Sequence, residues 1–201
     1  MTETPYKESY ITQLDSLFNI IEESDRRIMQ ETPDALFVGN VNFFTKSFLV
    51  IMCVYLEAYI KDVLEFYGNE FYGNELDKRL SSCLIPHNLV KWSFQPQSSL
   101  KASDQMDCVY KINITKENID KHISANPYRT KGLFTDLGIY LDGCTLFSEK
   151  IDEINSIVTK RNQIVHYNDD ASDVSDGDLK HYIVTIKEYI AVLDTEICRC
   201  I

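Results

Sequence analysis

The sequence predicts an all-α protein, and three observations support this prediction. Long segments repeat apolar residues at the three- and four-residue spacing that places them on one face of a helix. The chain has only 7 glycines and 5 prolines among its 201 residues, which argues for a packed, helix-rich protein rather than a disordered one. Apolar residues make up 44% of the chain, so one domain spanning residues 1–201 can bury a substantial core.

Two long helices are predicted in the first third of the chain. Residues 5–30 carry apolar side chains at helical spacing, and a proline such as Pro5 is tolerated in a first turn. Residues 42–67 are the most hydrophobic segment and contain an unbroken apolar run at residues 48–56. That run is too short to cross a bilayer, which needs about 20 residues. We therefore expect a central core helix and no membrane partner.

Residues 68–143 are the least regular part of the chain, and we predict that they form an insertion within the helical domain. Short helices are expected at 75–84, 115–124 and 130–137, and residues 108–112 are prone to form a strand. Thr115 is the expected N-cap of the second short helix, and Gly138 is expected to end the third. Specificity for a substrate or partner is expected to arise in this region.

Two amphipathic helices complete the expected fold. The first covers residues 149–166, with Ser148 as its expected cap. The second begins at a capping box formed by Ser175 and Asp178 and carries an apolar stripe as far as Ile197. The polar loop between them places aspartates three residues apart, whereas a calcium-binding EF-hand loop needs them at alternating positions. We therefore exclude an EF-hand.

Charge and cysteine usage restrict the possible functions. The chain has 20 Lys and Arg against 31 Asp and Glu, a net charge of −11, which excludes broad electrostatic capture of nucleic acid. Any contact with RNA must therefore be local. The six cysteines form no C-x-x-C pair and no cluster with zinc-ligand spacing, so we expect reduced thiols, no metal and no cofactor. The N-terminus lacks a signal-peptide pattern, and we expect a cytoplasmic protein.

Arg161 lies in the middle of the apolar face of the helix predicted at residues 149–166. Because a guanidinium keeps its proton, burying it requires a carboxylate, a phosphate or a water-filled crevice. Glu57 follows the apolar run of the core helix, and we expect it to pair with Arg161; alternatively, Glu57 faces solvent. His166 follows where the helix is expected to end. The apolar face consists of Ile151, Ile154, Ile157, Val158, Ile164 and Val165.

These residue types fit the cleavage of RNA, which carries its own nucleophile in the ribose 2′-hydroxyl. His166 is a candidate general base, because imidazole groups titrate near neutral pH. Arg161 can hold a phosphate through two hydrogen bonds, and Asn162 can orient the phosphate or the imidazole. The alternative is structural, since a histidine at a helix C-terminus is favoured by the helix dipole.

Arg161, Asn162 and His166 end one helix of an all-α chain and are followed by a polar loop and another amphipathic helix. In this arrangement the chain resembles the HEPN superfamily, whose members carry Arg, four to six residues, then His. It resembles more closely the small bacterial HEPN proteins of toxin–antitoxin and phage-defence loci, and residues 56–59 and 133–139 also fit them. The resemblance implies a HEPN-like helical bundle and a metal-independent endoribonuclease that leaves a 2′,3′-cyclic phosphate.

The resemblance also implies a homodimer whose active site lies at the interface, with an antitoxin or sensor protein as a further partner. The helical wheel agrees, because Arg161 and His166 point about 140° apart and a packed monomer tends to hide one while exposing the other. A two-fold dimer relieves this conflict. Two other functions stay open: a non-catalytic dimerisation or protein-interaction module, and a nucleotide-sensing module that uses the same Arg and His.

Overall fold

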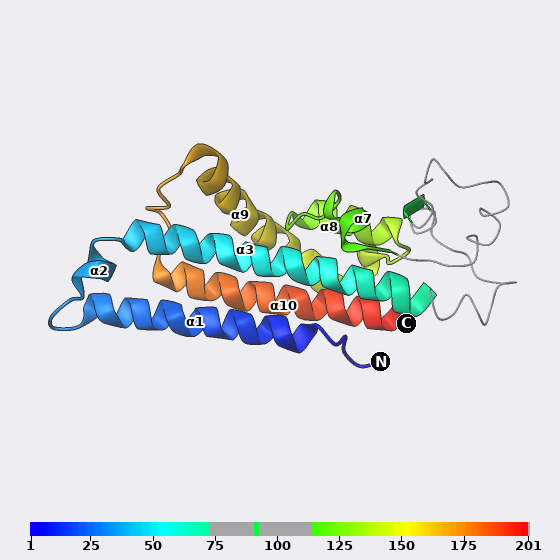
Figure 1. The fold of residues 1–201 in the computed structure, drawn as a ribbon, viewed down its shortest axis with the longest axis horizontal. Coiled ribbons are helices and arrows are strands. Elements are labelled where there is room, and N and C mark those ends of the chain that lie inside the picture. The colour runs from blue at the N-terminus through cyan, green and yellow to red at the C-terminus, as the bar shows by residue number, and fades with distance from the viewer. Residues whose placement is uncertain (73–90, 93–113, 201) are drawn as a thin grey trace, which may run out of the picture.

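The computed structural model describes residues 1–72, 91–92 and 114–200, and every regular element in these ranges is a helix. Three long helices, α1 (Lys7–Met29), α3 (Val41–Phe66) and α10 (Asp176–Cys200), lie side by side along the long axis (Figure 1). The fourth, α9 (Thr145–Tyr167), packs against α3 and α10 and tilts away from them towards its C-terminal end. The predicted all-α fold is confirmed.

Shorter helices connect these four. The helix predicted at 75–84 and the strand-prone segment at 108–112 lie outside the described residues, so both stay predictions. One short helix, α2, was not predicted; it follows Pro33 and is capped by Asp34, whose carboxylate accepts a hydrogen bond from the Leu36 amide at 2.9 Å. The short elements are α2 (Ala35–Val38), the π-helix η1 (Tyr67–Tyr72), α7 (Lys116–Asp120), α8 (Pro127–Asp136) and the 3-10 helix η2 (Leu141–Gly143).

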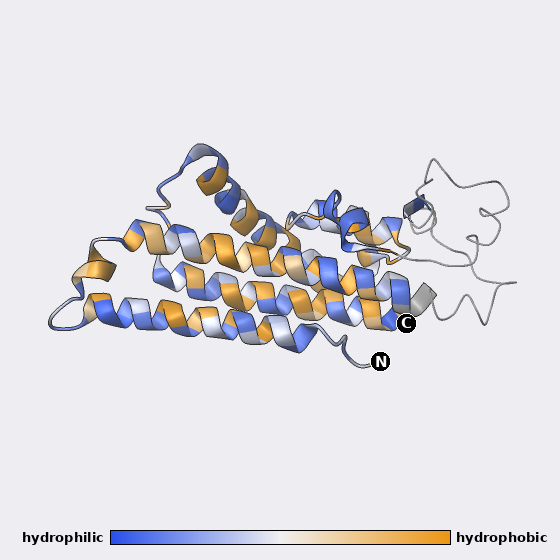
Figure 2. Ribbon diagram, in the orientation of Figure 1, coloured by the Kyte–Doolittle hydropathy of each residue, from blue (hydrophilic) through white to orange (hydrophobic). Residues whose placement is uncertain are grey.

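Helix α3 is the centre of the bundle and its most hydrophobic long helix (Figure 2). By length and composition, the segment from Val41 to Asn69 is the one stretch of the described residues that could cross a membrane. Ten of the α3 side chains are buried against the other helices, which accounts for its apolar character within the protein. Two others, Ile51 and Val54, are 36% and 45% exposed, so the helix is not covered on every side as predicted.

A buried polar cluster ties the chain's first residues to the bundle. The carboxylate of Asp194 on α10 is only 1% exposed. It accepts hydrogen bonds from the Thr4 amide at 3.1 Å, from the Thr4 hydroxyl, and from the Tyr59 hydroxyl at 3.0 Å. Because Thr4, Tyr59 and Asp194 belong to the N-terminal segment, α3 and α10 respectively, the cluster fixes one end of the three-helix bundle. Both chain ends lie near this end of the molecule (Figure 1).

Several helix boundaries differ from the predicted ones. Helix α8 begins at Pro127 rather than at residue 130, because Asn126 caps it and proline is well suited to a first helical position. Helix α9 begins at Thr145, four residues before its predicted start. The hydroxyl of Ser148 does not cap it and instead donates to the carbonyl oxygen of Cys144, inside the first turn.

Three predicted local features are confirmed. Thr115 and Asn118 form a capping box at the start of α7, although α7 ends at Asp120 rather than at residue 124. Gly138 follows α8 with a φ of 83°, a conformation that glycine adopts without steric strain. The Ser175 and Asp178 capping box forms the N-terminal end of α10: the Ser175 amide donates to the Asp178 carboxylate at 2.8 Å, and the Asp178 amide donates to the Ser175 hydroxyl at 3.1 Å.

Candidate functional site

Helix α9 turns one face towards α3, and Arg161 lies on that face. Four of the six apolar residues predicted for the face are buried, and a fifth, Ile151, is half-buried. Val165 was predicted to lie on the same face, but its side chain is 49% exposed, so that prediction is wrong. The reason is the tilt of α9, whose last turn leaves the bundle (Figure 1). The four buried residues are Ile154, Ile157, Val158 and Ile164.

The guanidinium of Arg161 is largely buried but only partly hydrogen-bonded. Its side chain is 21% exposed, and Nη2 lies 3.6 Å from Oε2 of Glu57. Nη1 donates a hydrogen bond to Oδ1 of Asn162 at 3.0 Å. Nε is buried and has no hydrogen-bond partner among the described residues. Because a buried donor without an acceptor is costly, the hydrogen-bonding capacity of Arg161 is not fully satisfied by the described residues.

Glu57 is the carboxylate predicted to pair with Arg161, and the structure contains this ion pair. The 3.6 Å separation allows electrostatic attraction but is too long for a good hydrogen bond. Its other oxygen, Oε1, accepts a hydrogen bond from the Ala125 amide at 3.2 Å. Glu57 therefore connects α3 with α9 and with the segment that precedes α8, while leaving most of the Arg161 donors available.

Cys53 lies one helical turn before Glu57 and is completely buried. Burial raises the pKa of its thiol to about 12, a shift that the nearby Arg161 cation opposes and the Glu57 anion reinforces. The thiol therefore stays protonated at neutral pH and is a poor nucleophile. Its role is to pack beneath the ion pair.

His166 lies in the last turn of α9 and is exposed to solvent. Its imidazole forms no hydrogen bond or ion pair with any described residue, so within one chain the structure does not join it to Arg161, Asn162 or Glu57. The chain turns sharply just beyond it, where Asn168 has a φ of 54° and ends the helix. Lys46 of α3 donates to the Asn168 side chain at 3.3 Å, which fixes this turn against the start of α3.

Lys160 anchors the loop after His166, a role that was not predicted. Its ammonium lies 2.8 Å from the Asp169 carboxylate and 2.5 Å from that of Asp173, and its side chain is only 13% exposed. Hydrogen bonds to these two carboxylates raise the pKa of Lys160, and the Lys160 partner lowers the pKa of Asp169. The aspartates of the polar loop were the available sequence signal, because they follow a lysine at the end of an amphipathic helix.

The site supplies cationic and imidazole groups rather than a metal-ligand cluster. Within the part of the chain that the structure describes, no three His, Cys, Asp or Glu side chains are grouped so as to hold a metal ion. The guanidinium of Arg161 can bind a phosphate oxygen, and His166 can exchange a proton.

One comparison with known proteins identifies a family for this chain. The family model described as RiboL-PSP-HEPN matches residues 8–199, which is nearly the whole chain and includes both Arg161 and His166. Neither the curated proteins nor the solved structures gave a match. HEPN domains indicate a nuclease or other RNA-related role. The extent of the family match places the chain, by sequence, in the RiboL-PSP-HEPN family of the HEPN superfamily.

Proposed function

We propose that this protein is a metal-independent endoribonuclease. The ribose 2′-hydroxyl attacks the adjacent phosphorus, and His166 takes the hydroxyl proton as general base. A bond forms between the 2′-oxygen and phosphorus while the bond to the 5′-oxygen breaks. The 5′-oxygen leaves with a proton returned by an imidazolium, and the other product carries a 2′,3′-cyclic phosphate. Acid–base catalysis of this kind contributes about 10²–10⁴-fold to the rate.

The proposal rests mainly on the incomplete hydrogen bonding of Arg161. Its guanidinium is held in a fixed position by Asn162 and Glu57, and its buried Nε lacks an acceptor. A phosphoryl oxygen is a suitable acceptor, because a guanidinium can bind it through two parallel hydrogen bonds. Charge builds on that oxygen during the reaction, so a positioned cation stabilises the transition state more than the ground state.

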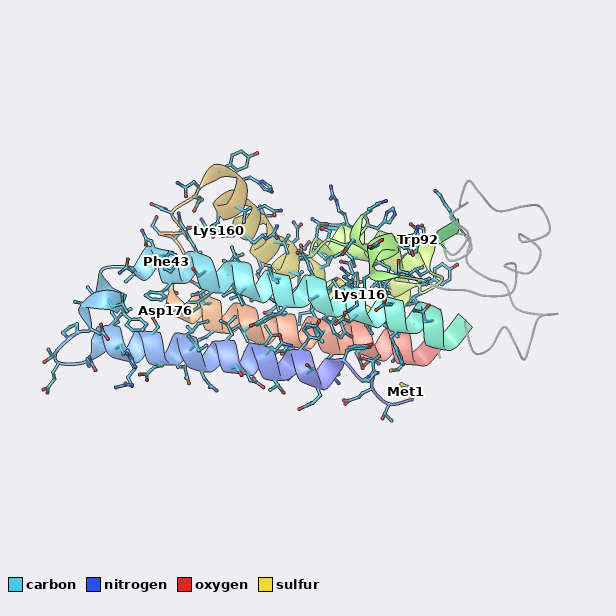
Figure 3. The ribbon with its side chains drawn as sticks, viewed as in Figure 1. Met1, Phe43, Trp92, Lys116, Lys160 and Asp176 are labelled. Atoms are coloured by element: carbon cyan, nitrogen blue, oxygen red, sulfur yellow. The ribbon has the colours of Figure 1, made fainter. Side chains whose placement is uncertain are left out.

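The active form in this proposal is a homodimer with a composite site. His166 is exposed and forms no hydrogen bond or ion pair with Arg161 within one chain, so in this proposal a second copy supplies the missing group. Exposed apolar residues of α3 and of the end of α9 offer that copy a surface, and one of them, Phe43, is labelled at the start of α3 in Figure 3. On α3 this surface includes Phe43, 65% exposed, together with Ile51 and Val54; on α9 it includes Val165 and Tyr167, 49% and 83% exposed. Exposed apolar residues gathered beside polar ones are typical of protein interfaces.

The direct test is cleavage of RNA by the purified protein and by Arg161→Ala and His166→Ala. Both variants should lose activity by at least about 100-fold. The matched controls are Arg129→Ala and His122→Ala, which remove the same residue types from exposed positions elsewhere and should cut RNA normally. EDTA should have no effect, and a substrate with deoxyribose at the cleaved position should resist cleavage. Normal cleavage by both motif variants refutes the proposal.

Composite sites can be tested by mixing the two inactive chains. A dimer of Arg161→Ala with His166→Ala has one intact site if each site takes Arg161 from one chain and His166 from the other. About half of randomly formed dimers are mixed, so activity should return to roughly a quarter of the wild-type level. No recovery in demonstrably mixed dimers contradicts the cross-chain site.

The biological role that we propose is that of a cytoplasmic toxin or anti-phage effector restrained by an antitoxin or sensor protein. Its expression should therefore inhibit growth, and either motif substitution should relieve the inhibition. A folded dimer that leaves RNA intact would instead indicate the non-catalytic interaction module. Tight nucleotide binding without cleavage would indicate the nucleotide-sensing module.

A further inference from the structure

A polar pocket lies on the side of α9 that faces away from α3. It has a volume of about 420 Å³, within the range of about 300–1,000 Å³ that is common for small-ligand sites. The pocket is bounded by α9, by the start of α10 and by the loop that joins them. The residues that matter for the argument are Asn155, Thr159, Lys160, Gln163, Asp173 and Tyr182.

Several hydrogen-bonding groups of this pocket have no protein partner. The side chains of Thr159, Gln163 and Tyr182 form no hydrogen bond with any described residue, although all three line the same pocket. Asn155 uses its oxygen to accept a hydrogen bond from Asn126 at 3.1 Å and keeps its amide N–H groups available. The pocket therefore offers both donors and acceptors, which suits the mixed edge of a nucleobase.

The pocket is adjacent to the proposed general base. Gln163 precedes His166 by three residues, so the two side chains are neighbours on one face of α9. Thr159 lies one turn further back and on the same face, and one helical turn rises about 5.4 Å. A nucleotide held by Gln163 and Thr159 is therefore directly beside a phosphodiester at His166.

The charges of the pocket argue against a phosphate and for a base. Its cation, Lys160, is already neutralised by Asp169 and Asp173. Asp173 is 71% exposed and adds a negative charge at the pocket edge. A carboxylate accepts hydrogen bonds from the exocyclic amino groups of adenine, cytosine and guanine, whereas uracil has no amino group and offers only its ring N3–H, which lies between two carbonyl oxygens that repel the carboxylate. The aromatic ring of Tyr182 adds a surface on which a base can stack.

We propose that this pocket binds the RNA base next to the cleaved phosphodiester and prefers bases with an exocyclic amino group. The inference takes RNA as the ligand and so rests on the function proposed above. Arg161 and His166 hold and cleave the phosphodiester, while the pocket selects where along the chain the cut falls. Local base binding of this kind also suits an acidic protein, because it depends little on attraction to the RNA backbone.

The test measures RNA binding without cleavage. His166→Ala protein is titrated into fluorescent decamers of adenylate, cytidylate and uridylate at one fixed salt concentration. The adenylate and cytidylate decamers should bind about 5- to 100-fold more tightly than the uridylate decamer. Introducing Gln163→Ala or Asp173→Ala into the His166→Ala protein should remove most of this difference in affinity. In the Asp173→Ala variant, Lys160 still has Asp169 as an ion-pair partner.

A matched pair of substitutions tests the stacking surface. Tyr182→Phe keeps the aromatic ring and should keep the preference, whereas Tyr182→Leu keeps the hydrophobic packing but should weaken binding of every decamer by about fivefold or more. Asn19→Ala, on the exposed surface of α1, is the control that should change nothing. Thermal unfolding of each variant verifies that it is folded.

The outcomes separate this inference from the proposed function. Equal affinity for all decamers, no binding of any decamer, or no effect of the pocket substitutions overturns the pocket assignment, even if the wild-type protein cuts RNA. Conversely, discrimination that depends on Gln163 and Tyr182, in a protein that cuts no RNA, supports the pocket and rejects the ribonuclease. In the cleaving protein, Gln163→Ala should also change the positions of the cuts.

Discussion

Two charged side chains, Asp194 and Arg161, differ in how completely neighbouring groups satisfy their hydrogen-bonding capacity. Asp194 is 1% exposed and accepts hydrogen bonds from the Thr4 amide and hydroxyl and from the Tyr59 hydroxyl. Arg161 has one hydrogen bond, to Asn162, a carboxylate at 3.6 Å and a buried Nε without a partner among the described residues. The first charge is saturated by its own chain. Arg161 is held in place by its partners, but some of its hydrogen-bond donors have no acceptor.

The number of hydrogen bonds that a buried charge makes within its own chain helps to distinguish structural polar groups from functional ones. A saturated buried charge connects elements and stabilises the fold, because each partner loses its hydrogen bond when the charge is removed. An incompletely paired charge adds less to stability and keeps its donors for another molecule. On this criterion Asp194 has a structural role, whereas Arg161 fits the functional role that we propose for it. The two residues should therefore respond to mutation in opposite ways.

The largest expected effect on stability is that of Asp194→Ala. The substitution leaves the Thr4 amide and the hydroxyls of Thr4 and Tyr59 without their acceptor, each in a buried position. We expect a loss of about 3–5 kcal/mol in the free energy of unfolding. Urea denaturation and the melting temperature, which should fall by about 10 °C, give the measurement. A loss below about 1 kcal/mol would show that the cluster is not structural.

Arg161→Ala should have the opposite effect to Asp194→Ala: a large loss of activity with little loss of stability. We expect cleavage to fall by about 10²–10³-fold, equivalent to about 2.7–4 kcal/mol of transition-state stabilisation, while the free energy of unfolding changes by less than about 1 kcal/mol. Glu57→Gln is the companion variant, because its amide can still accept the Ala125 hydrogen bond but no longer carries the charge that faces Arg161. It should retain the fold and reduce cleavage less than Arg161→Ala does. Unfolding of Arg161→Ala at moderate temperature would contradict this division.

The same contrast explains how much of the molecule could be predicted from sequence. Helical periodicity predicted α1, α9 and α10, because one face of each is buried and the apolar spacing reflects that burial. Helix α3 was predicted instead from its unbroken apolar run at residues 48–56. The ion pair of Glu57 with Arg161 was also predictable, since a charge interrupting an apolar face needs a partner. The burial of Val165 was predicted wrongly. The tilt of α9 results from packing between helices, so the apolar spacing within α9 does not predict it.

Other features depended on contacts that no local pattern contains. Asp194 looks like an ordinary helix residue in the sequence, and its partners Thr4 and Tyr59 lie far away along the chain. The pocket beside α9 is likewise assembled from α9, α10 and their connecting loop. The start of α9 was misplaced for a local reason: Ser148 is a good capping residue, but its hydroxyl bonds within the helix instead.

Replacing Glu23, an exposed carboxylate paired with two arginines, should have a smaller and pH-dependent effect on stability. Glu23 accepts hydrogen bonds from Arg26 and Arg27, and these bonds lower its pKa from the ordinary 4.5 to about 2. Because the folded-state pKa is the lower one, the pairing stabilises the protein above about pH 4.5, and this contribution disappears as the pH falls towards 2. Urea denaturation should show a small deficit for Glu23→Gln at pH 7 that shrinks at pH 3. A constant deficit at both pH values would exclude the ion pair as its cause.

The smallest effect is expected where a buried polar group has no partner and no charge. The side chains of Tyr59 and Tyr189 are both completely buried. The Tyr59 hydroxyl donates to the Asp194 carboxylate at 3.0 Å, whereas the Tyr189 hydroxyl has no hydrogen-bond partner among the described residues. Thr130 lies near Tyr189, but its hydroxyl proton is directed at the carbonyl oxygens of Ser124 and Asn126.

Tyr59→Phe and Tyr189→Phe are therefore the same chemical change at equal burial, and they should differ in effect. Tyr59→Phe removes a hydrogen bond to a charged group and should cost about 1.5–3 kcal/mol. Tyr189→Phe removes only a hydroxyl that is already unpaired, while its ring keeps its packing against Phe147 at 5.6 Å between centroids. Its free energy of unfolding should stay within about 1 kcal/mol of wild type or rise slightly. Equal losses for the two variants in urea denaturation would mean that the Tyr189 hydroxyl has a partner in solution, and that the saturation of a buried group does not predict its structural role.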